Sequence, residues 1–195
     1  MTKQRNILPQ VVERIRHDAP NCAVALSGSV RYGYQRPDSD IDLLVAVPDF
    51  RATEFQGATL SHQTDEARVA NFFVGDIRVE VVYFDFAYLD QVQQSPWRSY
   101  TLCQAQILHD SDGRFTRCQD ALREWFQAHP DITSVWEKQL QMCREYALTG
   151  RPPDRRTVLT FPSWEDFAKH VDALVQGEAT RPNTDSKDAP RGPSR

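Results

Sequence analysis

The feature that most constrains this chain is a pair of short apolar runs separated by a polar loop. Residues 22–26 read CAVAL and residues 41–47 read IDLLVAV, and both have the length and composition of buried β-strands. The loop, residues 27–39, contains glycine, serine and arginine. Because strands that enter a core rarely carry charge, the aspartates Asp40 and Asp42 at the start of the second run require an explanation.

The two aspartates are expected to project from the same face, because side chains alternate along a strand. Two ionised carboxylates this close repel each other, so a cation is expected between them, and Mg²⁺ prefers such oxygen ligands. A third acid, Glu80, interrupts the apolar run of residues 77–84. If that run pairs with residues 41–47, Glu80 completes the site, either as a third metal ligand or as a general base for an acceptor hydroxyl.

The loop before the aspartates has the composition of a phosphate-binding turn. Gly28 permits a tight turn and a close approach of backbone N–H groups to an anion, and the Ser29 hydroxyl adds a donor. Gly33 permits a second unusual backbone angle, and Arg31 carries positive charge toward a phosphate. With Ser39, these four residues form the candidate nucleotide-binding set.

The remaining pattern indicates an α+β fold. A helix with Asn6 as N-cap is expected over residues 7–15, and residues 49–68 fit a helix or a loop. A hairpin is expected around Gly75-Asp76. Further elements are expected as follows: strands 69–74, 77–84 and 106–109, and helices 86–92, 115–128, 134–148 and 163–175, the last capped by Ser163.

We therefore predict a small mixed β-sheet with helices on one face, followed by a C-terminal helical region. The expected division is a catalytic domain over residues 1–110, a helical region over residues 111–176 and a disordered tail over residues 177–195, which is rich in Pro, Ser, Asp and Arg.

The composition excludes few classes of function, but it bears on binding partners, membrane association and cellular compartment. The chain has 195 residues and a formal net charge of −4, so a broad basic surface for nucleic acid is not implied. The sequence contains no apolar stretch long enough to span a membrane and no apolar signal core near Met1. Four cysteines without a CxxC pair favour free thiols, and a cytoplasmic protein is expected.

The combination of these motifs resembles the DNA polymerase β-type nucleotidyltransferase superfamily, and in particular its minimal and aminoglycoside-type branch. The matching residues are Gly28 and Ser29 after a strand, Asp40 and Asp42 on the next strand, and Glu80 on a later one. The family's nucleotidyltransferase fold is expected for the catalytic part. One departure is Val30-Arg31-Tyr32, where many relatives carry a small and basic run such as Arg-Ala-Arg.

The resemblance implies transfer of a nucleoside monophosphate from an NTP, usually AMP from ATP, to an acceptor hydroxyl, with release of pyrophosphate. It implies two Mg²⁺ ions on Asp40 and Asp42, completed by Glu80, and β- and γ-phosphates on Gly28 and Ser29. A small, aminoglycoside-like acceptor is expected, in a monomer or homodimer. Two alternatives remain: an antitoxin-type enzyme that AMPylates a protein partner, and a catalytically inactive module that acts through binding.

Overall fold

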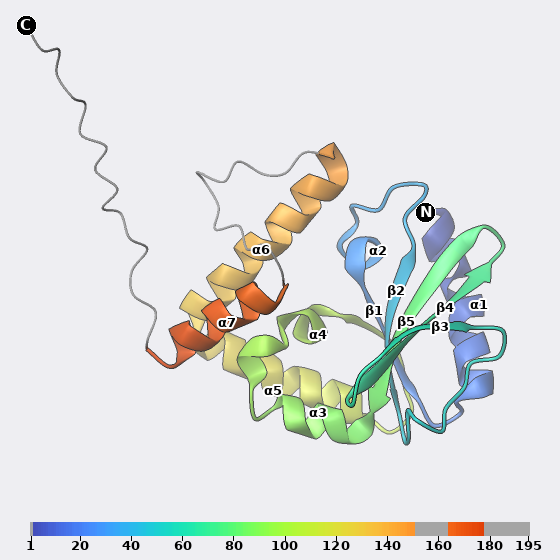
Figure 1. Cartoon of the computed structure of the whole chain (residues 1–195), viewed down its shortest axis with the longest axis horizontal. Coiled ribbons are helices and arrows are strands. Elements are labelled where there is room, and N and C mark those ends of the chain that lie inside the picture. The colour runs from blue at the N-terminus through green and yellow to red at the C-terminus, as the bar shows by residue number, and fades with distance from the viewer. Residues whose placement is uncertain (1, 151–163, 178–195) are drawn as a thin grey trace, which may run out of the picture.

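The computed structural model describes residues 2–150 and 164–177, and its centre is a six-stranded mixed sheet (Figure 1). The strand order is β3-β4-β5-β2-β1-β6. Strands β2 and β5 run parallel, and the other four pairings are antiparallel. The strands are β1 (Ala23–Ser27), β2 (Ile41–Val47), β3 (Thr59–Gln63), β4 (Ala67–Val74), β5 (Ile77–Asp85) and β6 (Gln106–Asp110).

Helices occupy both ends of the described chain. The α-helices are α1 (Lys3–Asp18), α2 (Gly28–Tyr32), α3 (Phe86–Val92), α4 (Tyr100–Gln104), α5 (Arg114–Ala128), α6 (Pro130–Thr149) and α7 (Trp164–Val175), with one 3₁₀ turn at Pro96–Arg98. The predicted α+β fold, with a mixed sheet followed by helices, is confirmed. Among the described residues, no helix combines the length and apolarity that crossing a lipid bilayer requires.

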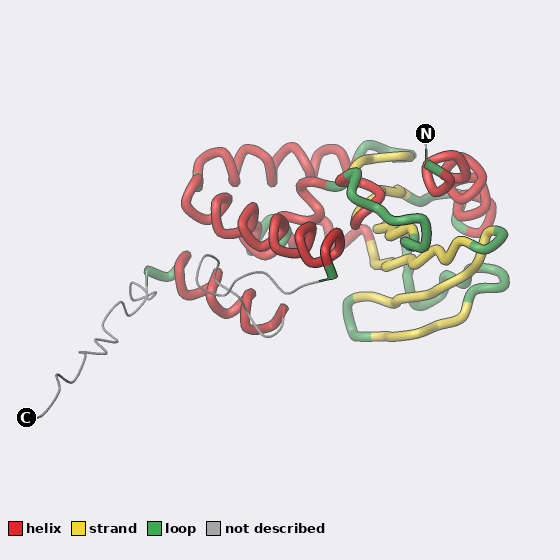
Figure 2. The backbone as a smooth tube through the Cα atoms, turned by 90° about the horizontal axis from the view of Figure 1, so that it is seen from above, coloured by secondary structure: helices red, strands yellow, loops and turns green. Residues whose placement is uncertain are grey.

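The two faces of the sheet carry separate apolar clusters. On one face, Ile41, Leu43 and Val45 of β2 pack with Val11 and Ile15 of α1. The alternate positions of the sheet face α3, α5 and the helices beyond them. Figure 2 shows the strands between α1 and these later helices. The helices of the C-terminal half therefore lie on one face, as expected, and α1 adds cover on the other.

Two local predictions were wrong. Helix α1 begins four residues earlier than Ile7, at Lys3, because the Thr2 hydroxyl accepts the Arg5 N–H at 3.5 Å and replaces Asn6 as the N-cap. The segment predicted as helix or loop contains strand β3, all of whose residues are exposed. It pairs with β4 at the edge of the sheet, so it lacks the alternating apolar pattern that identifies a half-buried strand.

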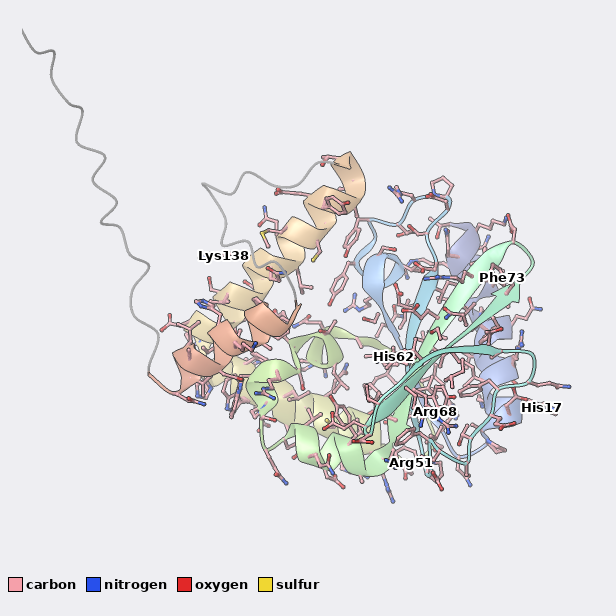
Figure 3. The ribbon with its side chains drawn as sticks, viewed as in Figure 1. His17, Arg51, His62, Arg68, Phe73 and Lys138 are labelled. Carbon is pink, nitrogen blue, oxygen red and sulfur yellow. The ribbon has the colours of Figure 1, made fainter. Side chains whose placement is uncertain are left out.

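The β4–β5 hairpin turns at Gly75, as predicted, and its two ends differ in character. Phe73 lies near the turn and is 62% exposed. Arg51 and Arg68 lie at the far end of the sheet, where Arg68 Nη1 donates to the Arg51 carbonyl at 2.9 Å (Figure 3). The hairpin therefore exposes an aromatic ring near its turn, and the half-buried Arg68 lies at its other end.

The helical region is attached to the sheet through buried aromatic side chains. Trp136 of α6 donates its Nε1 proton to the Trp97 carbonyl at 2.7 Å, and its ring contacts Phe167 of α7 edge-on. Asp172 of α7 accepts from Trp97 Nε1 at 2.8 Å and from Arg98. The predicted Ser163 cap and the predicted tail, apart from Gly177, lie outside the described residues.

Candidate active site

A row of polar side chains crosses the sheet where β2 begins. Asp42 of β2 is the register partner of Glu80 on the parallel strand β5, as the sequence led us to expect. Ser27 of β1 pairs with Asp42 on one side, and Asn71 of β4 pairs with Glu80 on the other. These residues share a face, so the acids of the two central strands lie side by side.

The surroundings of Asp42 disfavour its negative charge. The pKa of Asp42 is raised to about 6, first by burial and then by the charges of Asp40 and Glu80, while Arg78 lowers it. The three carboxylates therefore form one region of excess negative charge. These carboxylates are hard oxygen donors whose negative charges repel one another, so they suit a divalent cation such as Mg²⁺.

An arginine already partly neutralises the cluster. Arg78 donates from Nη2 to Asp40 Oδ2 at 2.6 Å and from Nε to the same oxygen at 3.2 Å. The same Nη2 lies 3.4 Å from Glu80 Oε2. In this arrangement, the described residues contain no group of three His, Cys, Asp or Glu side chains that could hold a metal ion. Two of the three acids are thus bonded to Arg78.

Gly28 lies directly against Asp42. Its φ is +62°, and a Cβ at this position would be 1.8 Å from Asp42 Oδ2. Only glycine can occupy this position without displacing the carboxylate. Ser29 follows in the first turn of α2, and Gly33, with φ of +78°, ends that helix by donating its N–H to the Ser29 carbonyl at 2.9 Å. The turn predicted to bind phosphate is therefore in contact with the acids.

Two of the predicted nucleotide-binding residues bond elsewhere. Arg31 donates from Nε to the Gln104 carbonyl at 2.9 Å, so its guanidinium is directed toward α4. The Ser39 hydroxyl accepts the Arg36 N–H at 2.9 Å, and its carbonyl accepts from the buried Gln4 at 3.1 Å. Both residues fix the path of the loop between β1 and β2, and the structure does not bring them into the acid row.

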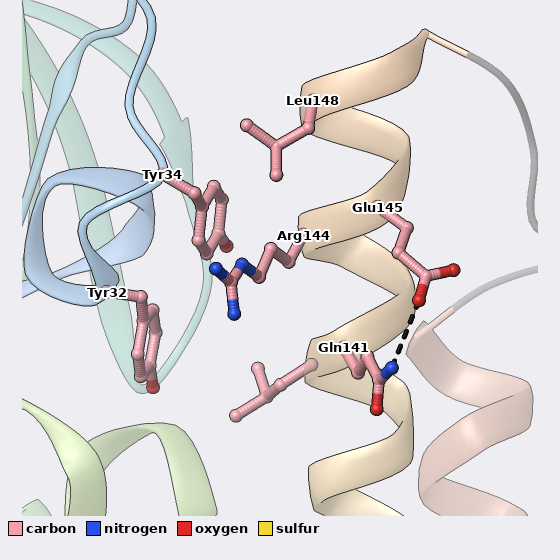
Figure 4. A pocket seen from close by; sticks show the side chains of 7 residues that line it. Tyr32, Tyr34, Gln141, Arg144, Glu145 and Leu148 are labelled. Carbon is pink, nitrogen blue, oxygen red and sulfur yellow. Dashed lines mark hydrogen bonds between the residues drawn. The ribbon is translucent and has the colours of Figure 1, made fainter.

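A cavity of about 510 Å³ lies between this loop and α6. The rings of Tyr32 and Tyr34 are parallel within 5° and their centroids are 6.2 Å apart (Figure 4). The Tyr32 Oη is buried and has no hydrogen-bond partner within the described part of the chain. The cavity is lined by Tyr32, Tyr34, Leu140, Gln141, Arg144, Glu145 and Leu148. It combines flat apolar surface with a few polar groups, as small-molecule sites do.

Tyr34 connects this cavity to the acids. Its pKa is raised by burial and then by the neighbouring Cys143 and Asp42, and Arg144 opposes these effects. The charge of Asp42 therefore contributes to the raised pKa of a tyrosine that lines the cavity. We call this the α6-side cavity.

A second cavity, of about 690 Å³, lies beside Asp40 and Arg78. We call it the β5-side cavity. It is lined by Arg36, Pro37, Asp38, Ser39, Asp40, Phe73, Asp76, Ile77 and Arg78. One cavity is thus closed by a helix, and the other includes Asp40 and is bordered by the β4–β5 hairpin.

Residues 8–88 match the family model for the nucleotidyltransferase domain. This range is 81 of the 195 residues. The match spans α1 to α3 and includes Gly28, Ser29, Asp40, Asp42 and Glu80, which confirms the resemblance drawn from these residues. No curated protein matches the chain.

Solved structures with some likeness to the nucleotidyltransferase domain have low identity and low TM-scores. A cytoplasmic RNA terminal U-transferase is 16% identical, with a TM-score of 0.35, over 52% of this chain and 36% of its own. The Cid1 poly(U) polymerase is 14% identical, with a TM-score of 0.33, over 51% and 37%. A nucleotidyltransferase-like protein from Exiguobacterium sibiricum 255-15 is 13% identical, with a TM-score of 0.38, over 91% and 68%. The chain spans little over a third of the first two proteins, so the assignment rests on the family match.

Several residues around the candidate site could not be identified from the local sequence pattern alone. Arg78 precedes Glu80 by two residues, so its position on the same face was available from strand alternation. Asn71 required knowledge of the β4–β5 register. Tyr34 and Arg144 meet only because α6 folds back toward the loop, and Arg144 lies outside the matched range, so local pattern gives no signal for their contact.

Proposed function

We propose that this chain is a Mg²⁺-dependent nucleotidyltransferase that transfers a nucleoside monophosphate, most simply AMP from ATP, to an acceptor hydroxyl and releases pyrophosphate. The observation that carries the proposal is the contact of Gly28 with Asp42, with Glu80 beside Asp42 in register. A turn suited to phosphate and a set of acids suited to a metal thus form one continuous surface.

The acids fit the proposed metal. Asp40 and Asp42 would hold it, and Glu80 would act as a third ligand or as the base. When bound, Mg²⁺ supplies neutralisation of the negative charge that develops on the phosphates during transfer. Gly28 and Ser29 would bind the β- and γ-phosphates through backbone N–H groups and the serine hydroxyl.

The two cavities suggest where each substrate binds. The α6-side cavity is lined by Tyr32, the last residue of the helix α2 that begins at Gly28, so we assign it to the nucleoside part of the NTP. Its parallel tyrosines suit stacking with a nucleobase, and the unpaired Tyr32 hydroxyl and Arg144 offer donors. The β5-side cavity is lined by Asp40 and by Arg78, which contacts Glu80, so we assign it to the acceptor.

In the proposed step, the acceptor oxygen forms a bond to the α-phosphorus, and the bond from that phosphorus to the oxygen bridging to the β-phosphate breaks. Pyrophosphate leaves with the electron pair. The hydroxyl proton passes to a Glu80 carboxylate oxygen if Glu80 is the base, and otherwise to water. The product is a nucleoside monophosphate ester of the acceptor.

The test measures pyrophosphate release with Mg²⁺ and each of the common NTPs, first with a panel of aminoglycoside-like polyols and then with a cell extract. We expect release with ATP and a labelled small molecule, and Asp42→Asn should reduce the rate by about 10³-fold or more. Because burial and the neighbouring acids disfavour the Asp42 charge, this variant should melt at the same or a higher temperature than the wild type.

The alternatives give different results in the same experiment. A labelled protein in the extract, with no labelled small molecule, would favour AMPylation of a partner. Absence of pyrophosphate with every NTP, together with no thermal shift on addition of Mg²⁺ and ATP, would favour an inactive binding module. Full activity in Asp42→Asn would contradict the metal assignment.

A further inference from the structure

Arg78 lies between two of the three acids and brings a positive charge next to both. Its Nη2 group lies 2.6 Å from Asp40 Oδ2 and 3.4 Å from Glu80 Oε2, so a single nitrogen contacts acids of two strands. On β5, Arg78 is two residues before Glu80, and Asp40 is two residues before Asp42, immediately ahead of the paired strand β2. Strand geometry therefore directs this guanidinium toward the acids.

These contacts compete with the proposed metal site. Asp40 Oδ2 accepts both the Nε and the Nη2 protons of Arg78. A carboxylate oxygen that is bonded twice to a guanidinium has little capacity left for a metal ion, and the two positive charges would repel each other. A metal bound by Asp40 and Asp42 therefore requires the Arg78 contact to break or to move.

The side chain of Arg78 is free to move. It is 48% exposed and lines the β5-side cavity of about 690 Å³. The other acids of that cavity already have partners, because Asp76 pairs with Lys3 and Asp38 pairs with Arg36 at 3.3 Å. A released guanidinium would therefore turn toward solvent on this side, without replacing an existing ion pair.

We propose that Arg78 is the counter-cation of the metal-free cluster, that it neutralises Asp40 and Glu80, and that it is displaced when the divalent metal binds. This inference rests on the proposed function, since it takes the acids to be the metal site. It makes Arg78 a positioning residue that keeps the acids folded together without metal and lowers their affinity for the metal.

The test is the affinity for Mn²⁺, measured by electron paramagnetic resonance on the full chain without nucleotide, because Mn²⁺ takes the same oxygen ligands as Mg²⁺. Arg78→Gln should bind Mn²⁺ about three- to tenfold more tightly than the wild type, as expected for the loss of two partly exposed competing ion pairs. Arg78→Lys keeps the charge but loses the planar fork, so its affinity should lie between the two.

A matched control is Arg51→Gln. Arg51 also pairs with an acid of β5, Asp85 at 3.9 Å, but at the opposite end of that strand from Arg78. The Arg51→Gln substitution removes the same charge as Arg78→Gln but leaves the acid cluster unchanged, so the Mn²⁺ affinity of this variant should equal that of the wild type. A second readout is thermal stability: Arg78→Gln should melt at a lower temperature than the wild type without metal, and saturating Mn²⁺ should close the gap.

The outcomes separate the inference from the proposed function. Mn²⁺ affinity in Arg78→Gln that equals or falls below the wild-type value would overturn the inference and leave the metal site intact. An equal increase in Mn²⁺ affinity in Arg51→Gln would also overturn the inference, because the change in the protein's net charge would then explain the effect. If the wild type and both Arg78 variants bind no Mn²⁺, the proposed metal site fails and the inference fails with it.

Discussion

Different kinds of chemical group lie on the two sides of Asp42. On the β1 side, the backbone of Gly28 lies against the carboxylate, and α6 closes a cavity that is lined by the ring of Tyr34. On the β5 side, Glu80 and Arg78 provide opposite charges, and their side chains are 32% and 48% exposed. The first side is defined by shape, and the second is defined by charge.

This difference matches the demands of the two proposed substrates. Every turnover would use the same triphosphate and nucleoside, so a closely fitted turn and an aromatic wall suit that side. An acceptor hydroxyl needs a base and access, which an open and charged surface provides. The comparison therefore predicts that changes on the β1 side alter nucleotide positioning and binding, while changes on the β5 side alter the chemical step.

The largest effect is expected where the two sides meet, at Gly28→Ala. The added methyl group would lie 1.8 Å from Asp42 Oδ2, so either the turn or the carboxylate must move by more than 1 Å. Because displacements of this size disrupt both phosphate binding and the acids, pyrophosphate release should fall by about 10³-fold. Steady-state kinetics with Mg²⁺ and the preferred NTP would measure this loss.

Gly33→Ala is the matched control for Gly28. Gly33 has a similar positive φ, +78°, but a Cβ there meets no atom within 4 Å. The substitution should cost about 1 kcal/mol of stability through backbone strain and leave most of the activity. Equal loss of activity in the two alanine variants would show that backbone strain, and not the contact with Asp42, sets the effect.

A smaller effect is expected on the β5 side, from Glu80→Gln. The amide keeps the size of the side chain but neither takes a proton nor carries charge to a metal, so kcat should fall by about 10²-fold. The KM for the NTP should change little, because Glu80 lies away from the α6-side cavity. The measurement is a kcat and KM pair for each substrate. A large rise in the KM for the NTP with an unchanged kcat would contradict the division between the two sides.

Much of the sheet that carries the acids could be predicted from the sequence, because its central strands are defined by local sequence patterns. Strand Ile41–Val47 and helix Phe86–Val92 have the predicted bounds, since continuous apolar runs and flanking polar residues define them. The β2–β5 pairing followed from placing Glu80 near Asp42. Strand β3 escaped prediction because all five of its residues are exposed and only pairing with β4 makes it a strand.

The parts that escaped prediction depend on contacts between distant segments. The α6-side cavity joins Tyr34 to Arg144, which are 110 positions apart in the sequence, and no periodicity relates them. The contacts of Arg31 and Ser39 have the same cause, because the partners of these residues, Gln104 and Gln4, come from other elements. Sequence pattern identifies the acids and the turn, and tertiary packing decides which neighbours face them.

The smallest catalytic effect is expected from Tyr34→Ala, and it tests the β1 side directly. Loss of the ring removes one of two parallel aromatic surfaces from the cavity, and base–aromatic stacking contributes about 1–3 kcal/mol. The KM for the NTP should therefore rise about tenfold, with kcat reduced much less, because the acids and Gly28 are unchanged. Tyr146→Ala removes a ring of α6 that is 57% exposed and does not line the cavity, so it should leave both constants unchanged. If Tyr34→Ala instead raises the KM for the acceptor alone, the acceptor binds beside α6, and the assignment of the two cavities must be exchanged.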